Sequence, residues 1–215
     1  KQEFEKQKEV LDIQVPSHWE TIKKDFEGVV FYKKSFRVPE SWIEGVFSLH
    51  FEAVNYKTEV WVNDQAVGTH EGGFTPFSFQ VDEVLKPGEI NHIIMRVVGP
   101  ILMTDQCIDE MGRMEVPQWR GAITGGIWQD VWIQRRGNVT IHDVFLKPDI
   151  DKSQTGIDLE LYNHQSAQQK TTLSIKVNDA AGNNVGVFEK NMDLDPGKNI
   201  LKTSVDIPNQ KLWSP

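Results

Sequence analysis

The sequence predicts an all-β protein built from two β-sandwiches, and three observations predict it. Apolar and polar residues alternate with a period of two along most of the 215 residues, as in strands with one buried and one solvated face. The alternating segments are short and regularly spaced. Sustained helical periodicity is absent from the pattern, so many short strands favour sandwiches over mixed folds.

Alternation in the first half predicts strands that bury one apolar face. In residues 46–51, Phe47, Leu49 and Phe51 share a face, while Ser48 and His50 lie opposite. A single helical turn is predicted at residues 82–85, with Asp82 as its cap. The other strands are expected at residues 30–38, 58–63, 75–81, 91–98 and 127–134.

The segment around Asn63 predicts a β-hairpin. Strand residues 59–62 lead into a short turn, and the chain returns through Ala66 and Val67. Asn63 tolerates the positive φ that such a turn requires.

The second half repeats the strand pattern, with turn residues at 179–183 and 195–197. Its strands are expected at residues 140–147, 156–163, 171–178, 185–191 and 199–206. Aromatic residues are concentrated before Asn138, with 17 there and 4 after it. This shift in composition predicts two domains, residues 1–137 and 138–215.

Composition excludes several partners and cofactors. With 31 acidic and 23 basic residues the net charge is -8, so the attraction that drives nucleic-acid binding is missing. No apolar run reaches the roughly 18 residues of a membrane span, and we expect no membrane partner. The single cysteine, Cys107, excludes an internal disulfide and a cysteine-based zinc site but leaves the compartment open.

Metal and cofactor sites are not expected either. The six histidines include no pair at helical ligand spacing. Asp149, Asp151, Ser153 and Glu160 match four positions of an EF-hand loop, but Gln154 stands where that loop needs glycine. We therefore predict no metal ligand and no cofactor.

Residues 99–125 break the strand rhythm and carry several acids. A loop this long inside a compact domain is usually functional or disordered, so it is the first place to look for a site.

Several motifs together point to one family. Residues 60–77 read VWVNDQAVGTHEGGFTPF and residues 125–133 read GGIWQDVWI. With VPSHWE at 15–20, FYKKSFRVPESW at 31–42 and KLWSP at the end, the chain resembles the N-terminal region of glycoside hydrolase family 2. The resemblance covers about residues 15–215. The family includes β-galactosidases, β-glucuronidases and β-mannosidases.

The resemblance implies a domain order and a role. In that family a jelly-roll sugar-binding domain is followed by an immunoglobulin-like sandwich, and then by a TIM barrel that carries both catalytic glutamates. The chain would be the front part of a retaining β-glycosidase, most similar to β-galactosidases, with no catalytic residue of its own. Its partners would be the missing barrel and a carbohydrate. Oligomeric state stays open.

The resemblance also nominates residues of the irregular loop. The corresponding family loop extends toward the barrel, so Gln118, Trp119 and Arg120 are candidates to approach substrate. Asp105 is the acid that would bind a sugar hydroxyl. The competing interpretation is a solvated interdomain loop.

Other positions are assigned to the framework by the same resemblance. Trp61, Trp128 and Trp132 would pack in the fold and not against sugar. Family members commonly have glycine where this chain has Asp64, which makes a tight primed turn less favourable there. Two alternatives to the enzyme role remain, a free-standing carbohydrate-binding module and a structural scaffold without hydrolase activity.

Overall fold

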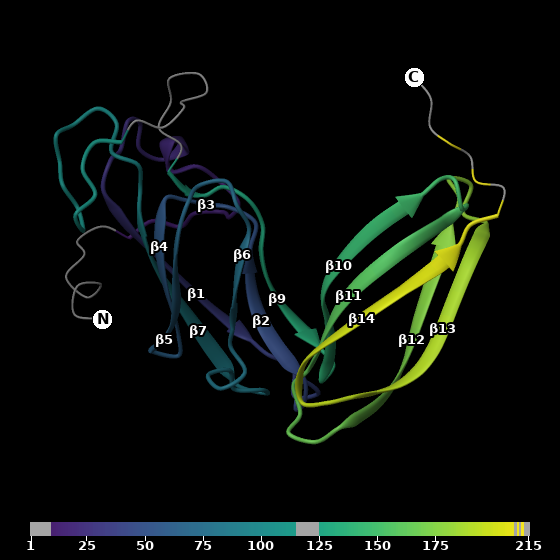
Figure 1. Ribbon diagram of the computed structural model, residues 1–215. Coiled ribbons are helices and arrows are strands. Elements are labelled where there is room, and N and C mark those ends of the chain that lie inside the picture. Colours follow the sequence, from purple (N-terminus) through teal and green to yellow (C-terminus); the bar gives the residue numbers. More distant parts are fainter. Residues whose placement is uncertain (1–9, 115–124, 209, 211, 213–215) are drawn as a thin grey trace. The chain divides into compact units, whose positions relative to one another are not determined.

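The all-β fold class is confirmed. The computed structural model describes residues 10–114, 125–208, 210 and 212, and the chain divides into two compact units between Arg135 and Arg136 (Figure 1). Apart from one 3-10 turn, η2 (Trp19–Thr21), the regular elements of these described residues are strands.

The first unit is a sandwich of short antiparallel strands. Its largest sheet has the order β1-β7-β4-β5, and a second sheet has the order β6-β2-β9. A short pair, β3-β8, lies between the longer strands in sequence. The bounds are β1 (Val29–Arg37), β2 (Val46–Phe51), β3 (Val54–Asn55), β4 (Lys57–Val62), β5 (Gln65–Glu71), β6 (Phe77–Gln80), β7 (Ile90–Val98), β8 (Gly126–Ile127) and β9 (Val131–Arg136).

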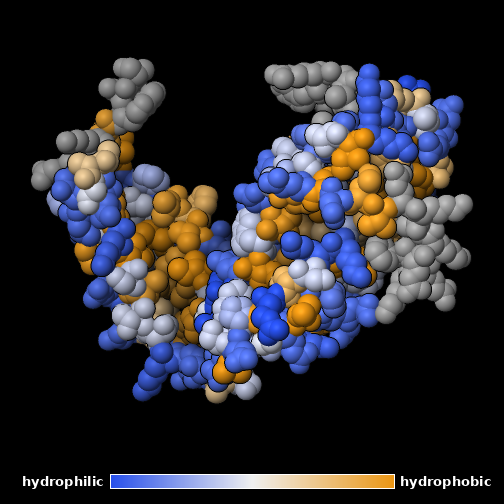
Figure 2. All heavy atoms as spheres, turned by 180° about the vertical axis from the view of Figure 1, so that it is seen from behind, coloured by the Kyte–Doolittle hydropathy of each residue, from blue (hydrophilic) through white to orange (hydrophobic). Residues whose placement is uncertain are grey.

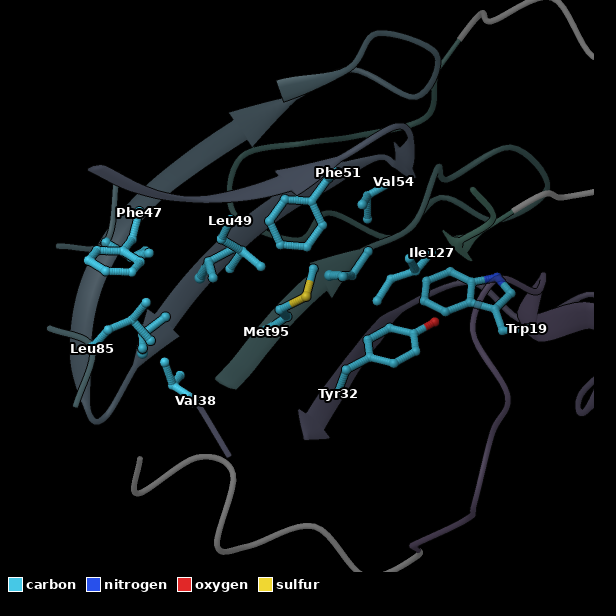
Figure 3. Packing of buried hydrophobic residues seen from close by; sticks show 14 residues of the cluster. Trp19, Tyr32, Val38, Phe47, Leu49, Phe51, Val54, Leu85, Met95 and Ile127 are labelled. Atoms are coloured by element: carbon cyan, nitrogen blue, oxygen red, sulfur yellow. The ribbon is translucent and has the colours of Figure 1, made fainter. Parts of the chain in front are cut away.

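The core of the first unit forms between these sheets. Phe47, Leu49 and Phe51 of β2 point into it, as the alternation predicts, beside Met95 of β7 (Figure 3). Trp19 caps one end of the same cluster and is 3% exposed. These large side chains bury apolar area between the two sheets, which stabilises their packing.

One local prediction in the first unit is wrong, and a second is correct only in part. The segment expected as one strand at 127–134 is broken after Ile127, because the Trp128 indole donates to the Gly73 carbonyl oxygen at 2.9 Å. Before the break, β8 pairs with β3. After the break, β9 pairs with β2. Residues 82–85 form the single turn that the sequence predicts, in which the Leu85 N–H donates to the Val81 carbonyl oxygen at 3.0 Å, but the Asp82 carboxylate accepts a hydrogen bond from the Phe47 N–H at 2.5 Å and not from its own turn.

The hairpin between β4 and β5 has the tight primed turn that Asp64 argues against. Asn63 and Asp64 have φ values of 50° and 67°, and Val62 pairs with Gln65 across the turn. Aspartate, like asparagine, tolerates the left-handed conformation. The Asn63 side chain holds the turn by donating to the Asn91 side-chain oxygen and accepting from the His92 N–H.

The second unit contains five described strands in two sheets. One sheet has the order β10-β11-β14 and the other pairs β12 with β13. The inner residues of β11 and β12 share a core cluster that includes Leu159 and Leu173. The bounds are β10 (Val139–Asp149), β11 (Gln154–Asn163), β12 (Gln169–Asn178), β13 (Asn184–Leu194) and β14 (Gly197–Asp206).

The outer face of the three-stranded sheet carries charged ladders. Asp158 of β11 lies between Lys147 of β10 and Lys202 of β14, and pairs with both. Two residues further along the same face of β11, Glu160 forms an ion pair with Lys198 at 2.5 Å. Exposed pairs of this kind contribute little free energy, but they mark this face as the solvated one.

Candidate functional site

The loop that follows β7 carries the candidate site residues. Its described part, residues 99–114, includes Asp105, whose side chain is exposed. Gln118, Trp119 and Arg120 lie outside the described residues. We call residues 99–114 the anchored loop, because three sets of contacts fix it to the first unit.

Glu27 makes the first anchor. Its carboxylate accepts hydrogen bonds from the backbone N–H groups of Leu102 and Met103, each at 2.6 Å, and from that of Thr104 at 3.0 Å. The Thr104 hydroxyl donates to the same carboxylate at 2.5 Å. Burial acts to raise the pKa of Glu27, but these four hydrogen bonds outweigh it and lower the pKa. The ionised carboxylate therefore holds the chain immediately before Asp105.

Arg96 makes the second anchor, just beyond Asp105. This buried guanidinium on β7 forms a two-pronged ion pair with the Asp109 carboxylate and also reaches Glu59 of β4 at 2.9 Å. The hydrogen bond from Arg96 lowers the pKa of Asp109, while the bond to Asp109 raises that of Arg96. A buried charge left without its partner is costly, so this pairing fixes the loop strongly.

The loop is also internally folded around Asp109. Ile108 and Met111 pair as an antiparallel bridge, and the two residues between them have positive φ values of 51° and 67°. The Met114 N–H donates to the Ile101 carbonyl oxygen at 2.7 Å and closes the described segment. Asp105 consequently lies on a short, exposed stretch between two fixed points.

Trp19 makes the third anchor by holding both ends of residues 99–125. A Cβ atom built on Gly99 would lie 2.1 Å from the Trp19 ring, and one on Gly125 would lie 1.7 Å from it. Only glycine allows the backbone to approach the indole so closely at both places. The backbone N–H of Trp19 also donates to the Gly125 carbonyl oxygen at 3.1 Å.

Sequence reasoning missed all three anchoring residues. Trp19 belongs to the VPSHWE motif, but its partners, Gly99 and Gly125, are 80 and more residues away. The sequence around Glu27 and Arg96 does not indicate their role, because acidic residues in loops and basic residues in strands are common. Only the pairing of distant segments reveals their role.

Two sets of stacked aromatic rings, one around Trp128 and one at Trp132, lie elsewhere in the first unit. The His18 ring stacks on Trp128 with centroids 6.1 Å apart, and Phe74 contacts Trp128 edge-on at 5.6 Å. Trp132 is 40% exposed and stacks on His50 at 5.2 Å. Trp128 is thus engaged in packing, as the framework assignment expects, whereas Trp132 contributes a partly exposed ring.

The described residues give little support for other kinds of site. No group of three or more histidine, cysteine, aspartate or glutamate side chains among them could hold a metal ion. Nor does that part of the chain contain a helix that is long and apolar enough to cross a membrane. A shallow hollow on β12 and β13 is lined by one carboxylate, Asp193, with Lys170, Thr171, Thr172, Asn191 and Met192.

Comparison with known families identifies both units. Residues 13–136 match the model described as glycosyl hydrolases family 2, sugar binding domain, and residues 139–215 match glycosyl hydrolases family 2. The chain belongs to glycoside hydrolase family 2. The predicted family is thereby confirmed, and the two units are N-terminal domains of that family.

Relatives of this family 2 chain are much longer than the chain itself. It is 30% identical over 193 residues to a β-galactosidase of Thermoanaerobacterium thermosulfurigenes, a match that covers 85% of the chain and 25% of that protein. It is 24% identical over 224 residues to a β-glucuronidase of Paenibacillus borealis, with 96% and 35% covered. The chain therefore spans about a quarter to a third of these relatives.

Solved structures share the fold. A β-glucuronidase of Bacteroides uniformis superposes with a TM-score of 0.78 at 20% identity, over 95% of this chain and 25% of that one. A family 2 member of Bacteroides cellulosilyticus gives 0.77 at 18% identity, over 94% and 28%. The jelly-roll and immunoglobulin-like sandwiches expected from sequence agree with this likeness.

Proposed function

We propose that this chain is the non-catalytic front region of a family 2 glycosidase, most similar to β-galactosidases. Residues 1–137 would be the jelly-roll sugar-binding domain and residues 138–215 the immunoglobulin-like domain. In the intact enzyme these domains would support a catalytic barrel and contribute a loop to its substrate pocket. The support is that the chain matches the sugar-binding domain model and a second model of family 2, and covers about a quarter of the length of the β-galactosidase relative.

The carboxylates of the chain favour a non-catalytic role. A retaining glycosidase needs one carboxyl group with a raised pKa as its acid, about 5 Å from a second as its nucleophile. In the described part of the chain, the carboxyl groups with a clearly shifted pKa all shift downward, because hydrogen bonds or ion pairs stabilise the charged form. They are Glu27, Asp109, Asp149, Asp158 and Asp179.

The anchored loop is the observation that carries the pocket role. Glu27 fixes the backbone just before Asp105 and Arg96 fixes Asp109 just after it, so an exposed carboxylate is presented on a rigid base. Preorganised polar groups bind sugar hydroxyls without a large ordering cost. We propose that Asp105, Gln118, Trp119 and Arg120 contact the substrate of the intact enzyme.

The test uses the longer gene product and two aryl substrates, a β-galactoside and a β-glucuronide. We expect Asp105→Asn, and the triple substitution of Gln118, Trp119 and Arg120 by alanine, to lower kcat/KM about tenfold or more. Asp151→Asn, an exposed acid in the second unit, is the control and should leave kcat/KM unchanged.

Three results would count against the proposal. Turnover by the 215 residues alone would place catalysis within this chain. Unchanged kinetics in both loop variants, with unchanged melting temperatures, would favour a scaffold. Saturable glycan binding by the 215 residues in calorimetry would favour the carbohydrate-binding module instead.

A further inference from the structure

Three of the family motifs meet at one point inside the first unit. The backbone N–H of Trp19, in VPSHWE, donates to the carbonyl oxygen of Gly125, in GGIWQDVWI, at 3.1 Å. On the next residue, a Cβ atom built on Gly126 would lie 2.6 Å from the hydroxyl oxygen of Tyr32, which belongs to FYKKSFRVPESW. Figure 3 shows the Tyr32 side chain pointing toward the Trp19 indole. The motifs therefore surround a single peptide unit, Gly125–Gly126.

Three side chains around this peptide carry buried polar atoms that have no hydrogen-bond partner among the described residues. They are the indole Nε1 of Trp19, the Oε2 of Glu20 and the hydroxyl of Tyr32. Trp19 is 3% exposed and Tyr32 is 9% exposed. A Cβ atom built on Gly125 would lie 2.0 Å from Trp19 Nε1, and the other carboxylate oxygen of Glu20 accepts from the Gly125 N–H at 3.3 Å. Donors and acceptors thus lie around the same peptide, yet none of the three atoms bonds to another.

Water satisfies the polar groups at the surface of the molecule. Figure 2 shows hydrophilic residues spread over both units in that view, where solvent reaches them. Bulk solvent does not reach the three buried atoms. An unpaired buried polar atom costs free energy, and a carboxylate oxygen costs most, so such atoms in folded proteins nearly always bond to the protein or to an ordered water.

The chemistry of the three groups selects a neutral ligand that both donates and accepts. The Trp19 indole N–H can only donate, so it repels a metal cation, and an ionised Glu20 carboxylate only accepts, so it repels an anion. Burial raises the pKa of Tyr32, although the Ile127 backbone acts in the opposite direction, so the hydroxyl stays protonated and can donate as well as accept. A water molecule fits all three partners, because buried waters typically make about three hydrogen bonds.

We propose that an ordered water molecule is bound at the Gly125–Gly126 peptide inside the first unit. The water accepts a hydrogen bond from the Trp19 indole N–H, donates one to the Glu20 carboxylate and bonds to the Tyr32 hydroxyl. Residues 99–125 lead back into β8 at this peptide, so the water supports the C-terminal end of that segment from within the core. This water site is independent of any catalytic or pocket role.

The unaltered protein provides the first test. In a high-resolution crystal structure of the chain we expect a solvent peak within hydrogen-bond distance, roughly 2.7–3.2 Å, of all three atoms. In solution the Trp19 indole proton should show cross-relaxation with a long-lived bound water. The lack of both signals would overturn the proposal, as would a protein side chain at this position.

Removing the Tyr32 hydroxyl gives a second test, in which the two interpretations differ in sign. If the hydroxyl bonds to water, Tyr32→Phe should lower the melting temperature of the first unit by about 3–6 °C. If the hydroxyl is buried without a partner, the same change removes an unsatisfied group and leaves the melting temperature unchanged or higher, which would overturn the proposal. The control is Tyr162→Phe in the second unit. Its side chain is 39% exposed, so the shift should be less than about 1 °C.

A double-mutant comparison tests whether one water joins Tyr32 to Glu20. The Tyr32 hydroxyl makes no direct hydrogen bond to Glu20, so the effects of the two substitutions should add unless a bound molecule connects them. We expect Tyr32→Phe to shift the melting temperature at most about half as much in Glu20→Gln as in the parent protein, because the amide presents a donor where Oε2 accepts. Equal shifts in the two backgrounds would contradict a shared water.

Discussion

Replacing Glu27 tests whether the anchored loop is held as described. The carboxylate accepts four hydrogen bonds, three of them from consecutive backbone N–H groups. Glu27 is only partly buried, so each bond is assigned the low value of about 0.5 kcal/mol. Glu27→Ala should therefore destabilise the closed loop by about 2 kcal/mol, or about 30-fold. Glu27→Gln keeps one acceptor oxygen and should cost about half as much, or about fivefold.

Amide exchange at Leu102, Met103 and Thr104 measures this opening directly. The pKa of Glu27 is lowered in the folded protein, so its contribution is complete above the usual glutamate pKa near 4 and is lost as pH falls through the lowered value. Protection of the three amides, corrected for intrinsic exchange, should decline in that acidic range in the parent protein but not in Glu27→Gln.

The control for this experiment is Glu83→Gln, which changes an exposed acid in a distant turn. It should leave the three amides as protected as in the parent protein. Unaltered protection in Glu27→Ala, or an acid-dependent loss that persists in Glu27→Gln, would refute the assignment of Glu27 as the anchor.

Three further predictions concern stability, measured by chemical or thermal unfolding. Gly125→Ala should cost about 3 kcal/mol or more, because its Cβ would overlap the buried Trp19 ring, whereas Gly112→Ala meets nothing within 4 Å and should be nearly neutral. Asn91→Ala should cost about 2–3 kcal/mol, since this fully buried side chain makes four hydrogen bonds, and a cost below about 0.5 kcal/mol would show that water replaces them. Asp64→Gly should stabilise the hairpin by about 0.5 kcal/mol, and a loss of stability would argue against strain at φ 67°.

Local sequence patterns were sufficient for most strands. Alternation over residues 156–163 and 199–206 predicts β11 and β14 to within two residues, because each strand buries one face and turns the other toward solvent. The pattern failed at Trp128, where alternation continues through a break. The side chain leaves the strand to donate to Gly73, 55 residues away, and no local property encodes that bond.

The sequence predicted the candidate site only in part. The irregular composition of residues 99–125 identifies the loop, and the family resemblance nominates Asp105 in it. The means by which the loop is held was not predictable, because Glu27, Arg96 and Trp19 act through contacts across the fold.

By itself, the sequence determined the all-β class, most strand positions and the family, since period-two alternation and short motifs are local properties. Only the tertiary structure decided which distant residues anchor the loop and which faces are left uncovered. Ile141, Val144 and Leu146 are apolar and alternate as in any buried strand, yet about half of each is exposed. The physical reason is that burial depends on which strands lie opposite, and strand pairing is settled by contacts between segments far apart in the chain.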